Sequence, residues 1–508
     1  MDTDGPRERA EATRTSEEGP SDHSMGARIA SGLAWKTLSQ VLAYGTQVIV
    51  LITMAHLLTP RDFGLAGMVM VFSALVSRVP DLGLGAALVQ RPVLDPGDRS
   101  TAFWASTAVG GFLTAVCLVT APAVAAFYGE PRVRPLFMAF GFAFLLEGIA
   151  TTQGALLMRE MAFRSLEIRI MAATVCGAAV GIGVAVAGGG PWAIVLQSLA
   201  STAVGVVLLW RFSSWRPSAS FSRVSLRNLG KFGGNVFGAR LLLLARGNVD
   251  NVLVGRFLGP AALGAYALAY NIMLIPLNRL GTPVQEVFYP AFAKLRDLDR
   301  IASAWFRANK LVAAVAAPAL LGLMVLAPDF IHVVVGARWR RAVPVLQILT
   351  YIGLLQALQL LNISVLQAAN RTGVLLRYWV LVSIASVAAF VIGLHWGIVG
   401  VAAAYAVSST VMEPYYAFVT VAAVGTTLSG FARNIARVLA AAVAMALVVL
   451  GVRAMLVGAG LGPAPRLLVC AVIGVAVYLL LFMRVEPLLG HEILGAARRL
   501  ARRVPATR

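Results

Sequence analysis

Charged and amide side chains interrupt one apolar stretch of this sequence. Residues 229–259, LGKFGGNVFGARLLLLARGNVDNVLVGRFLG, carry Asn235, Arg240, Arg246, Asn248, Asp250 and Asn251. A charge near the centre of a bilayer is costly, so it normally faces a cavity or a partner. Arg246 and Asp250 are spaced to pair along one helix face, whereas Arg240 has no acidic residue within one turn. We therefore expect Arg240 to line a cavity, the alternative being a salt bridge to another helix. Arg246 and Asp250 either join the cavity or form a neutral structural pair.

The predicted cavity is cationic. An arginine guanidinium binds phosphate through paired hydrogen bonds, so these residues favour an anionic ligand over a strongly hydrated metal cation. Asn235 and Asn251 are expected to add polar groups to the same lumen.

Other charged residues within or beside apolar runs are further candidates: Lys36, Arg78, Glu147, Arg279 and Glu413. Lys36 lies in the inner half of the first run, and Arg78 and Arg279 end the second and eighth runs at matching places. The three cations are either topology charges or part of the cavity and its mouth. Glu147 and Glu413 are either protonation sites or partners between helices, and Pro414 predicts a kink after Glu413.

The composition restricts the class of protein that positions these residues. The chain has 508 residues, of which 59% are hydrophobic and 13% charged, and its mean hydropathy is +0.79. A soluble domain has about a quarter charged residues, so we expect an all-α polytopic membrane protein. The net charge of +20 does not indicate nucleic-acid binding, because most Lys and Arg lie in short segments between apolar runs.

No chemistry beyond binding is indicated. The sequence has no phosphate-binding GxxxxGK[ST] loop, no nucleophile–base set and no paired carboxylates in a cleft. Its three cysteines and five histidines are scattered, which argues against a metal site. We expect neither an enzyme nor a cofactor.

About fourteen segments are long and apolar enough to span a bilayer. Their predicted limits are 30–58, 62–79, 100–127, 133–152, 165–187, 190–211, 229–258, 261–283, 303–328, 342–364, 373–394, 396–424, 432–459 and 465–484. With the N-terminus inside, most of the 43 Lys and Arg fall on the inner side, which predicts that both termini are cytoplasmic.

An internal repeat is visible at an offset of about 200 residues. LLTPRDFG (57–64) matches FLGPAALG (257–264), so that Leu58, Pro60 and Gly64 align with Leu258, Pro260 and Gly264. SRVPDLG (77–83) resembles NRLGTPV (278–284), and APAVAAFYGEPRVRPLF (121–137) resembles APDFIHVVVGARWRRAVPVL (327–346). Both copies begin at an odd-numbered helix, so the repeat is parallel and predicts two lobes that alternate access to a midplane site.

The repeat and the charge pattern together predict six parts of the chain. These are a disordered cytoplasmic tail (1–27), an N-lobe of six helices (28–212), a cytoplasmic linker (213–228), a C-lobe of six helices (229–424), a terminal helix pair (425–484) and a basic amphipathic cytoplasmic tail (485–508). The last tail is either an interfacial helix on anionic lipid or a simple topology signal.

Several of these segments resemble a known family. GLAWKTLSQVLAYGTQVIVLITMAHLLTPRDFGLAGMVMVFSALVSRVPDLGLGAALVQRP, STAFWAS, APAVAAFYGEPRV, ALLMREMAF, NVDNVLVGRFLGPAALGAYALAYNIMLIP and VQEVFYPAFAKLRD are similar to bacterial polysaccharide flippases. These belong to the multidrug/oligosaccharidyl-lipid/polysaccharide exporter superfamily, and the similar branch is that of colanic-acid-exporter-type lipopolysaccharide biosynthesis proteins. The resemblance covers about residues 28–425.

The resemblance implies a function and a site. It implies two six-helix lobes around a cationic cavity in the bacterial plasma membrane. It also implies that a polyprenyl-diphosphate-linked oligosaccharide is flipped from the inner to the outer leaflet. By this resemblance, the diphosphate would be held by Arg240 and Arg246, with Lys36, Arg78 and Arg279 as further candidates. Membrane lipids, a polysaccharide polymerase and glycosyltransferases are the implied partners.

Two other functions remain open at this point. An ion-coupled multidrug exporter of the same superfamily would need Glu147, Asp250 and Glu413 to dominate the cavity over the arginines. A scaffold for polysaccharide assembly would need no transport, but the duplicated lobes and the charges within the membrane argue against it.

Overall fold

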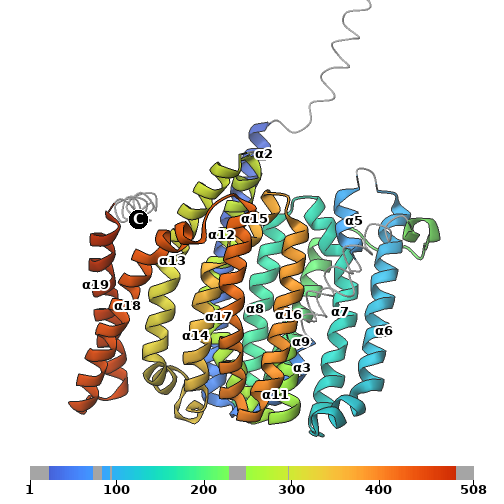
Figure 1. The fold of residues 1–508 in the computed structure, drawn as a ribbon. Coiled ribbons are helices and arrows are strands. Elements are labelled where there is room, and N and C mark those ends of the chain that lie inside the picture. The colour runs from blue at the N-terminus through green and yellow to red at the C-terminus, as the bar shows by residue number, and fades with distance from the viewer. Residues whose placement is uncertain (1–21, 73–82, 92–93, 228–247, 296, 488–508) are drawn as a thin grey trace, which may run out of the picture. The chain divides into compact units, whose positions relative to one another are not determined.

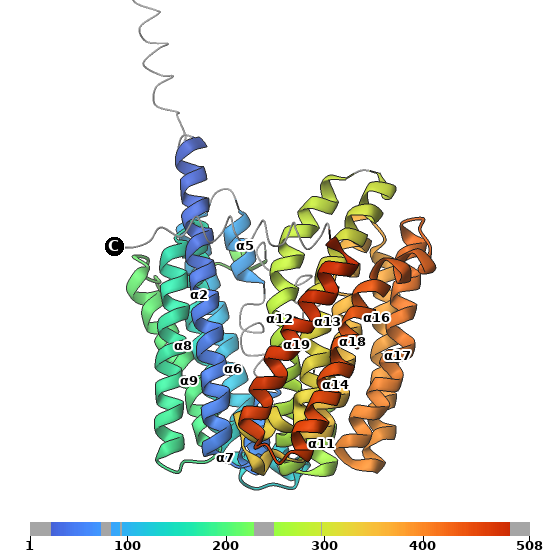
Figure 2. The same cartoon turned by 90° about the vertical axis from the view of Figure 1, so that its left-hand side faces the viewer.

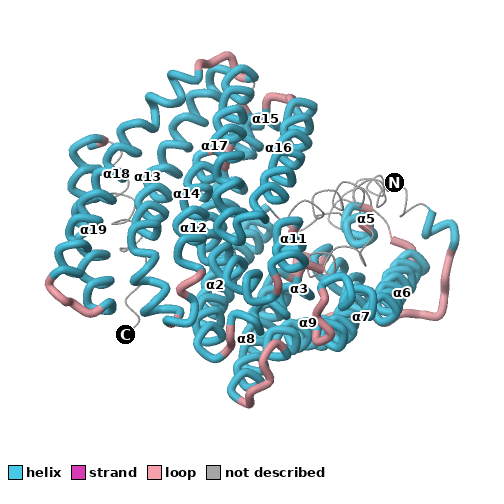
Figure 3. Tube along the Cα trace, turned by 60° about the horizontal axis from the view of Figure 1, so that its bottom comes forward, coloured by secondary structure: helices cyan, strands magenta, loops and turns pink. Residues whose placement is uncertain are grey.

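The computed structural model describes residues 22–72, 83–91, 94–227, 248–295 and 297–487, and every regular element in these ranges is helical (Figures 1 and 3). The α-helices are α2 (Asp22–Leu57), α3 (Pro60–Met70), α5 (Leu84–Gln90), α6 (Pro96–Tyr128), α7 (Val133–Arg159), α8 (Phe163–Val186), α9 (Trp192–Phe212), α11 (Val249–Leu258), α12 (Pro260–Lys294), α13 (Leu298–Phe330), α14 (Ala342–Leu358), α15 (Asn362–Ala368), α16 (Thr372–Gly393), α17 (Gly397–Ala423), α18 (Leu428–Gly458) and α19 (Pro463–Val485). A π-helical segment, η1 (Ile331–Val335), and two 3-10 turns, η2 (Ala337–Trp339) and η3 (Leu394–Trp396), complete them.

The helices have the length and composition of membrane spans. Within the described ranges, 11 helical stretches are long and apolar enough to cross a bilayer, and one of them, Thr372–Ala423, contains both α16 and α17. The expected all-α polytopic membrane fold is therefore confirmed. Each predicted segment contains at least part of a helix, but the count of fourteen stays a prediction, because residues 73–82 and 228–247 lie outside the description.

The chain forms two compact units. The first comprises residues 1–54, 72–124 and 134–244, and the second comprises 55–71, 125–133 and 245–508. The second unit thus includes two early segments, namely the end of α2 with α3 and the turn between α6 and α7. The predicted domain boundaries stay predictions.

Glycines allow close helix contacts in the first unit. A Cβ on Gly110 or Gly148 would overlap the backbone of the partner helix in the α6–α7 pair. Gly177 and Gly181 lie equally close to Ser201 and Gln197 in the α8–α9 pair, and Figure 2 shows these two helices side by side. Small residues at crossings are how membrane helices gain packing contacts, since lipid supplies no hydrophobic driving force between helices.

The second unit has a core centred on α13. Trp305 is fully buried there and stacks on Phe431 of α18 with ring centroids 5.0 Å apart. Helices α18 and α19 pack beside α13 (Figures 1 and 2). The Tyr478 hydroxyl of α19 donates to the Ala314 carbonyl of α13 at 2.7 Å.

The predicted helix 342–364 is interrupted. Helix α14 ends at Leu358 and α15 begins at Asn362. The carbonyls freed by the break are satisfied by side-chain amides: Asn309 donates to Leu358 and Gln285 donates to Leu360, each at 2.9 Å. Periodicity did not indicate this break, because the compensating donors come from α12 and α13.

The repeated proline motif forms two similar helix junctions. Pro60 and Pro260 are the first residues of α3 and α12. A proline cannot continue the helix before it, and α2 and α11 end at Leu57 and Leu258, close to the predicted limits of 58 and 258. Thr59 caps α3 through a capping box with Asp62. Its counterpart Gly259 has φ +82°, a backbone conformation that favours glycine.

The two copies of this motif contact each other reciprocally. A Cβ on Gly64 would overlap the Pro260 carbonyl oxygen, and a Cβ on Gly264 would overlap the Pro60 carbonyl oxygen. The aligned glycines therefore let α3 and α12 cross with their first turns in direct backbone contact.

Candidate functional site

A row of polar side chains joins α2, α8 and α7 within the first unit. Ser39 of α2 is 2% exposed, and its hydroxyl contacts both the Lys36 carbonyl, at 3.0 Å, and a carboxylate oxygen of Glu167 on α8. Arg169 lies two residues farther along α8, and it lines the same two hollows as Glu147 of α7. The row therefore runs from Ser39 through Glu167 and Arg169 to Glu147.

The charged end of this row lies inside the membrane-spanning part of the unit. Arg169 is about 9 Å along α8 from Phe163, and Glu147 is about 18 Å along α7 from Arg159, at the helical rise per residue. Charges at this depth are rare and usually serve a site or pair with one another.

Two hollows meet at Glu147 and Arg169. The larger, about 410 Å³, is also lined by Gln90 and Thr151 and lies among α5, α7, α8 and α9. The smaller, about 170 Å³, is lined by Thr174, Ser201 and Thr202 between α7, α8 and α9. The Arg169 Nε is buried, and in the part of the chain that the structure describes it has no hydrogen-bond partner. The pair therefore has room beside it for water or for a polar ligand group.

Asp250 forms a separate polar site in the second unit. Its carboxylate is buried and accepts from the Tyr266 hydroxyl of α12 at 3.1 Å and from the Asn251 amide at 2.9 Å. Tyr266 stacks on Tyr270 with ring centroids 6.2 Å apart. The predicted pairing with Arg246 stays a prediction, since that residue lies outside the description.

The predicted site residues fall into three groups. Arg78, Asn235, Arg240 and Arg246 lie outside the described residues, and of Arg279 only the backbone, in α12, is described. Lys36 is half-buried in α2 and Glu413 is 8% exposed in α17, which continues through Pro414 as one helix. Glu147 and Asp250 belong to different units, each with its own polar neighbours.

The residues around these acids were not predicted from the sequence. Ser39, Glu167, Arg169 and Tyr266 were not among the predicted site residues, and Arg169 fits the pattern of a topology charge at the inner end of a span. The available signal was the pair of opposite charges in LEIRIM (166–171), which lies inside the predicted span 165–187.

Comparison with known families identifies the chain's class. Residues 53–344, more than half of the chain, match the model of a family described as polysaccharide biosynthesis protein. The chain belongs to this family. The polysaccharide biosynthesis family therefore accounts for the sequence resemblance, and the protein is a multi-pass membrane protein.

Curated relatives align with most of the chain. Teichuronic acid biosynthesis protein TuaB of Bacillus subtilis (strain 168) is 29% identical over 360 residues, which is 70% of this chain and 74% of TuaB. Lipopolysaccharide biosynthesis protein WzxC of Escherichia coli (strain K12) is 25% identical over 377 residues, which is 73% of this chain and 76% of WzxC.

Solved structures of two transporters have a similar fold. The lipid II flippase MurJ in an inward closed conformation has a TM-score of 0.71 at 13% identity, covering 90% of this chain and 99% of MurJ. An inward-facing multidrug resistance MATE transporter of the MOP superfamily has a TM-score of 0.58 at 14% identity, covering 78% of this chain and 94% of the transporter.

Proposed function

We propose that this protein flips a polyprenyl-diphosphate-linked oligosaccharide from the inner to the outer leaflet of the bacterial plasma membrane. The observation that carries the proposal is membership of the polysaccharide biosynthesis family over residues 53–344. The fold is consistent with it, since a lipid II flippase has a similar structure. The product would be an exopolysaccharide or lipopolysaccharide precursor.

The proposed mechanism is alternating access between two lobes. The diphosphate would be held by arginines, chiefly Arg240 and Arg246, because paired guanidinium hydrogen bonds suit phosphate oxygens. Lys36, Arg78 and Arg279 would add positive charge. No covalent bond is made or broken, so the protein would act as a transporter and not as an enzyme. Both termini would be cytoplasmic, beside the glycosyltransferases that build the substrate and the polymerase that uses it.

A genetic experiment tests this function. Deleting the gene should abolish surface polysaccharide and cause the lipid-linked oligosaccharide to accumulate at the inner leaflet, and the wild-type chain should restore display. We expect Arg240→Ala to restore less than a tenth of display, since a lost charge-assisted contact costs about 1.5–3 kcal/mol. The control is Arg134→Ala, an exposed arginine at the start of α7.

The outcomes separate the alternatives. Full display with Arg240→Ala at equal protein levels would remove Arg240 from the site but leave the flippase function standing. Unchanged display after gene deletion, together with drug resistance in an efflux-deficient strain that expresses the chain, would instead favour a multidrug exporter.

A further inference from the structure

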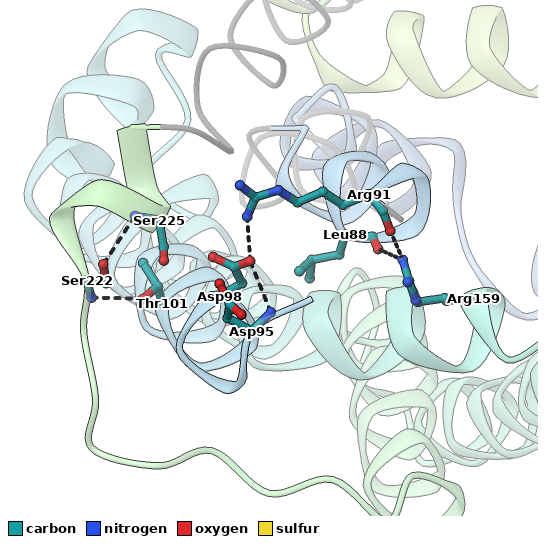
Figure 4. Close-up of polar contacts among 8 residues, drawn as sticks. All are labelled: Leu88, Arg91, Asp95, Asp98, Thr101, Arg159, Ser222 and Ser225. Atoms are coloured by element: carbon teal, nitrogen blue, oxygen red, sulfur yellow. Dashed lines mark hydrogen bonds and ion pairs between the residues drawn. The ribbon is translucent and has the colours of Figure 1, made fainter. Parts of the chain in front are cut away.

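The segment after α9 is held against the start of α6 in the first unit. The Ser218 amide donates to the Ser100 hydroxyl at 3.1 Å, and the Trp104 indole donates to the Ser218 carbonyl at 2.9 Å. Farther on, the Ser222 amide donates to the Thr101 hydroxyl at 3.0 Å (Figure 4). Residues 213–227, here called the linker strap, therefore follow a defined path along the end of the helix.

Aromatic side chains anchor the other end of the linker strap. Trp215 and Trp210 both pack edge-on against Phe103 of α6. Arg216 donates to the carbonyls of Ser213 and Trp215 and lies over the Trp210 ring. Arg216 thus stabilises the junction between α9 and the strap.

The strap and the last turn of α9 expose both positive charge and apolar side chains. Arg211 at the end of α9 is exposed, as are Arg223 and Arg227 of the strap, and so are Phe221 (52%) and Val224 (69%). The sequence contains no Asp or Glu between residues 168 and 249. The acid nearest the anchor, Asp98, is buried and paired with Arg91 (Figure 4). The charge of these arginines is therefore not neutralised by the strap itself or by Asp98.

The strap lies at the depth of a membrane interface. Trp104 is about 12 Å from the start of α6 at Pro96 and about 36 Å from its end at Tyr128, whereas the hydrocarbon core is about 30 Å thick. Trp104 therefore lies near the boundary of the hydrocarbon, where tryptophan is enriched. Its hydrogen bond to Ser218 holds the strap at the same level.

We propose that the linker strap is a binding surface for the head groups of anionic phospholipids in the adjoining leaflet. The arginines pair with lipid phosphates, while Phe221 and Val224 enter the region between head groups and acyl chains. The surface would fix the strap on the membrane between α9 and the residues that precede α11.

The combination of residues favours lipid over an acidic peptide. The acid-rich residues 2–21 of this chain complement the arginines in charge, but their sequence contains no large apolar side chain that could pack on the exposed Phe221 and Val224. A lipid surface satisfies both features at the depth set by Trp104. Deleting residues 2–21 serves as one arm of the test.

The test uses the full-length protein in nanodiscs with a fluorophore on the strap. Ala219 is exposed, so the fluorophore is attached at residue 219 in a Cys176→Ala, Ala219→Cys background. Its quenching is measured with brominated phosphatidylglycerol and, in a separate sample, with brominated phosphatidylcholine. We expect stronger quenching by phosphatidylglycerol. The variant R211Q/R223Q/R227Q should lower this preference by about fivefold for each arginine removed. The charge-conserving R211K/R223K/R227K variant should keep it.

Controls separate a local surface from a general charge effect. The variant R132Q/R134Q/R340Q removes the same charge from exposed positions elsewhere and should leave the preference unchanged. Equal quenching by both lipids in the starting background would overturn the proposal, as would an equal loss in this control. A preference for phosphatidylglycerol that emerges only after deletion of residues 2–21 would assign the surface to that segment. Loss of this preference on addition of millimolar inorganic diphosphate would assign the surface to a soluble phosphate ligand.

Discussion

Glu147 and Arg169 show how a charge can be tolerated inside this membrane protein. Each belongs to a different helix of the first unit, and the two hollows at the pair leave space for water beside it. Because an unpaired charge near the bilayer centre costs about 2.5–3.5 kcal/mol on insertion scales, the opposite charges of Glu147 and Arg169 at the same two hollows offset part of the cost of placing each other there. We predict that these two charges also contribute to transport, because they border space that can hold water or a polar ligand group.

Neutralising this pair separates its two roles. Either Glu147→Gln or Arg169→Gln alone should reduce the amount of folded protein, because the remaining charge loses its partner. The double variant E147Q/R169Q should recover folding, as measured by the midpoint of thermal unfolding in detergent, but restore less than a tenth of polysaccharide display.

The matched control removes charges from the exposed ends of the same helices. Glu160 and Arg164 are exposed beyond α7 and at the start of α8, so E160Q/R164Q should preserve both folding and display. Full display by E147Q/R169Q would show that the pair is structural only.

At the scale of elements, α19 is tied to α13 at three levels. Near one end, Asp329 accepts from Arg453 of α18 at 2.5 Å and from the Arg466 Nε of α19 at 2.9 Å. Tyr478 donates to the Ala314 carbonyl in the middle, and Lys310 pairs with Glu486 at the other end at 3.1 Å. The terminal helix pair should therefore move with the second unit and not independently.

Asp329→Asn tests this attachment. The substitution leaves two arginines facing each other, so the free energy of unfolding should fall by about 3 kcal/mol, the low end for a broken buried pair, since Arg453 remains partly exposed. Thermal unfolding in detergent measures the loss, and limited proteolysis between α17 and α18 reports detachment. Asp299→Asn, at an exposed position near the start of the same helix, should change little. Equal stability of the two variants would contradict the role assigned to Asp329.

At the scale of the whole molecule, the duplicated motif provides a contact between its own copies. Gly64 lies on the Pro260 carbonyl and Gly264 lies on the Pro60 carbonyl. Each copy of the motif therefore supplies a glycine and also the proline carbonyl that the other copy's glycine contacts. Such reciprocity is the pattern of a two-fold interface. Residues 327–346, the later copy of another repeated segment, contact the end of α2. The Trp339 indole donates to the Ala55 carbonyl at 2.8 Å, and the Arg338 guanidinium donates to the Leu58 carbonyl at 3.3 Å.

Adding a methyl group at either glycine should disturb this contact equally. Gly64→Ala and Gly264→Ala should each lower the free energy of unfolding by about 1–3 kcal/mol, the usual cost of overpacking. Gly67→Ala is the control on α3, because its Cβ would meet only the Leu263 side chain, at 3.4 Å. We expect Gly67→Ala to be neutral or slightly stabilising, through its higher helix propensity. A Gly64→Ala protein as stable as the Gly67→Ala protein would contradict the close contact.

The sequence by itself determined the class of fold and the ends of the two helices that precede the repeated proline motif. Apolar runs of about 20 residues leave helices as the solution in lipid, and Pro60 and Pro260 ended helices where expected. It also identified Glu147 and Asp250 as unusual, because a charge in an apolar run is visible without knowing its neighbours.

Only the tertiary structure decided which groups meet. Arg169 proved to be near Glu147, Tyr266 donates to Asp250, and side chains of α12 and α13 compensate the break between α14 and α15. Hydropathy and spacing describe each helix along its own axis. Contacts between helices depend on the rotation and depth of one helix against another, and that is set by packing partners distant in the sequence.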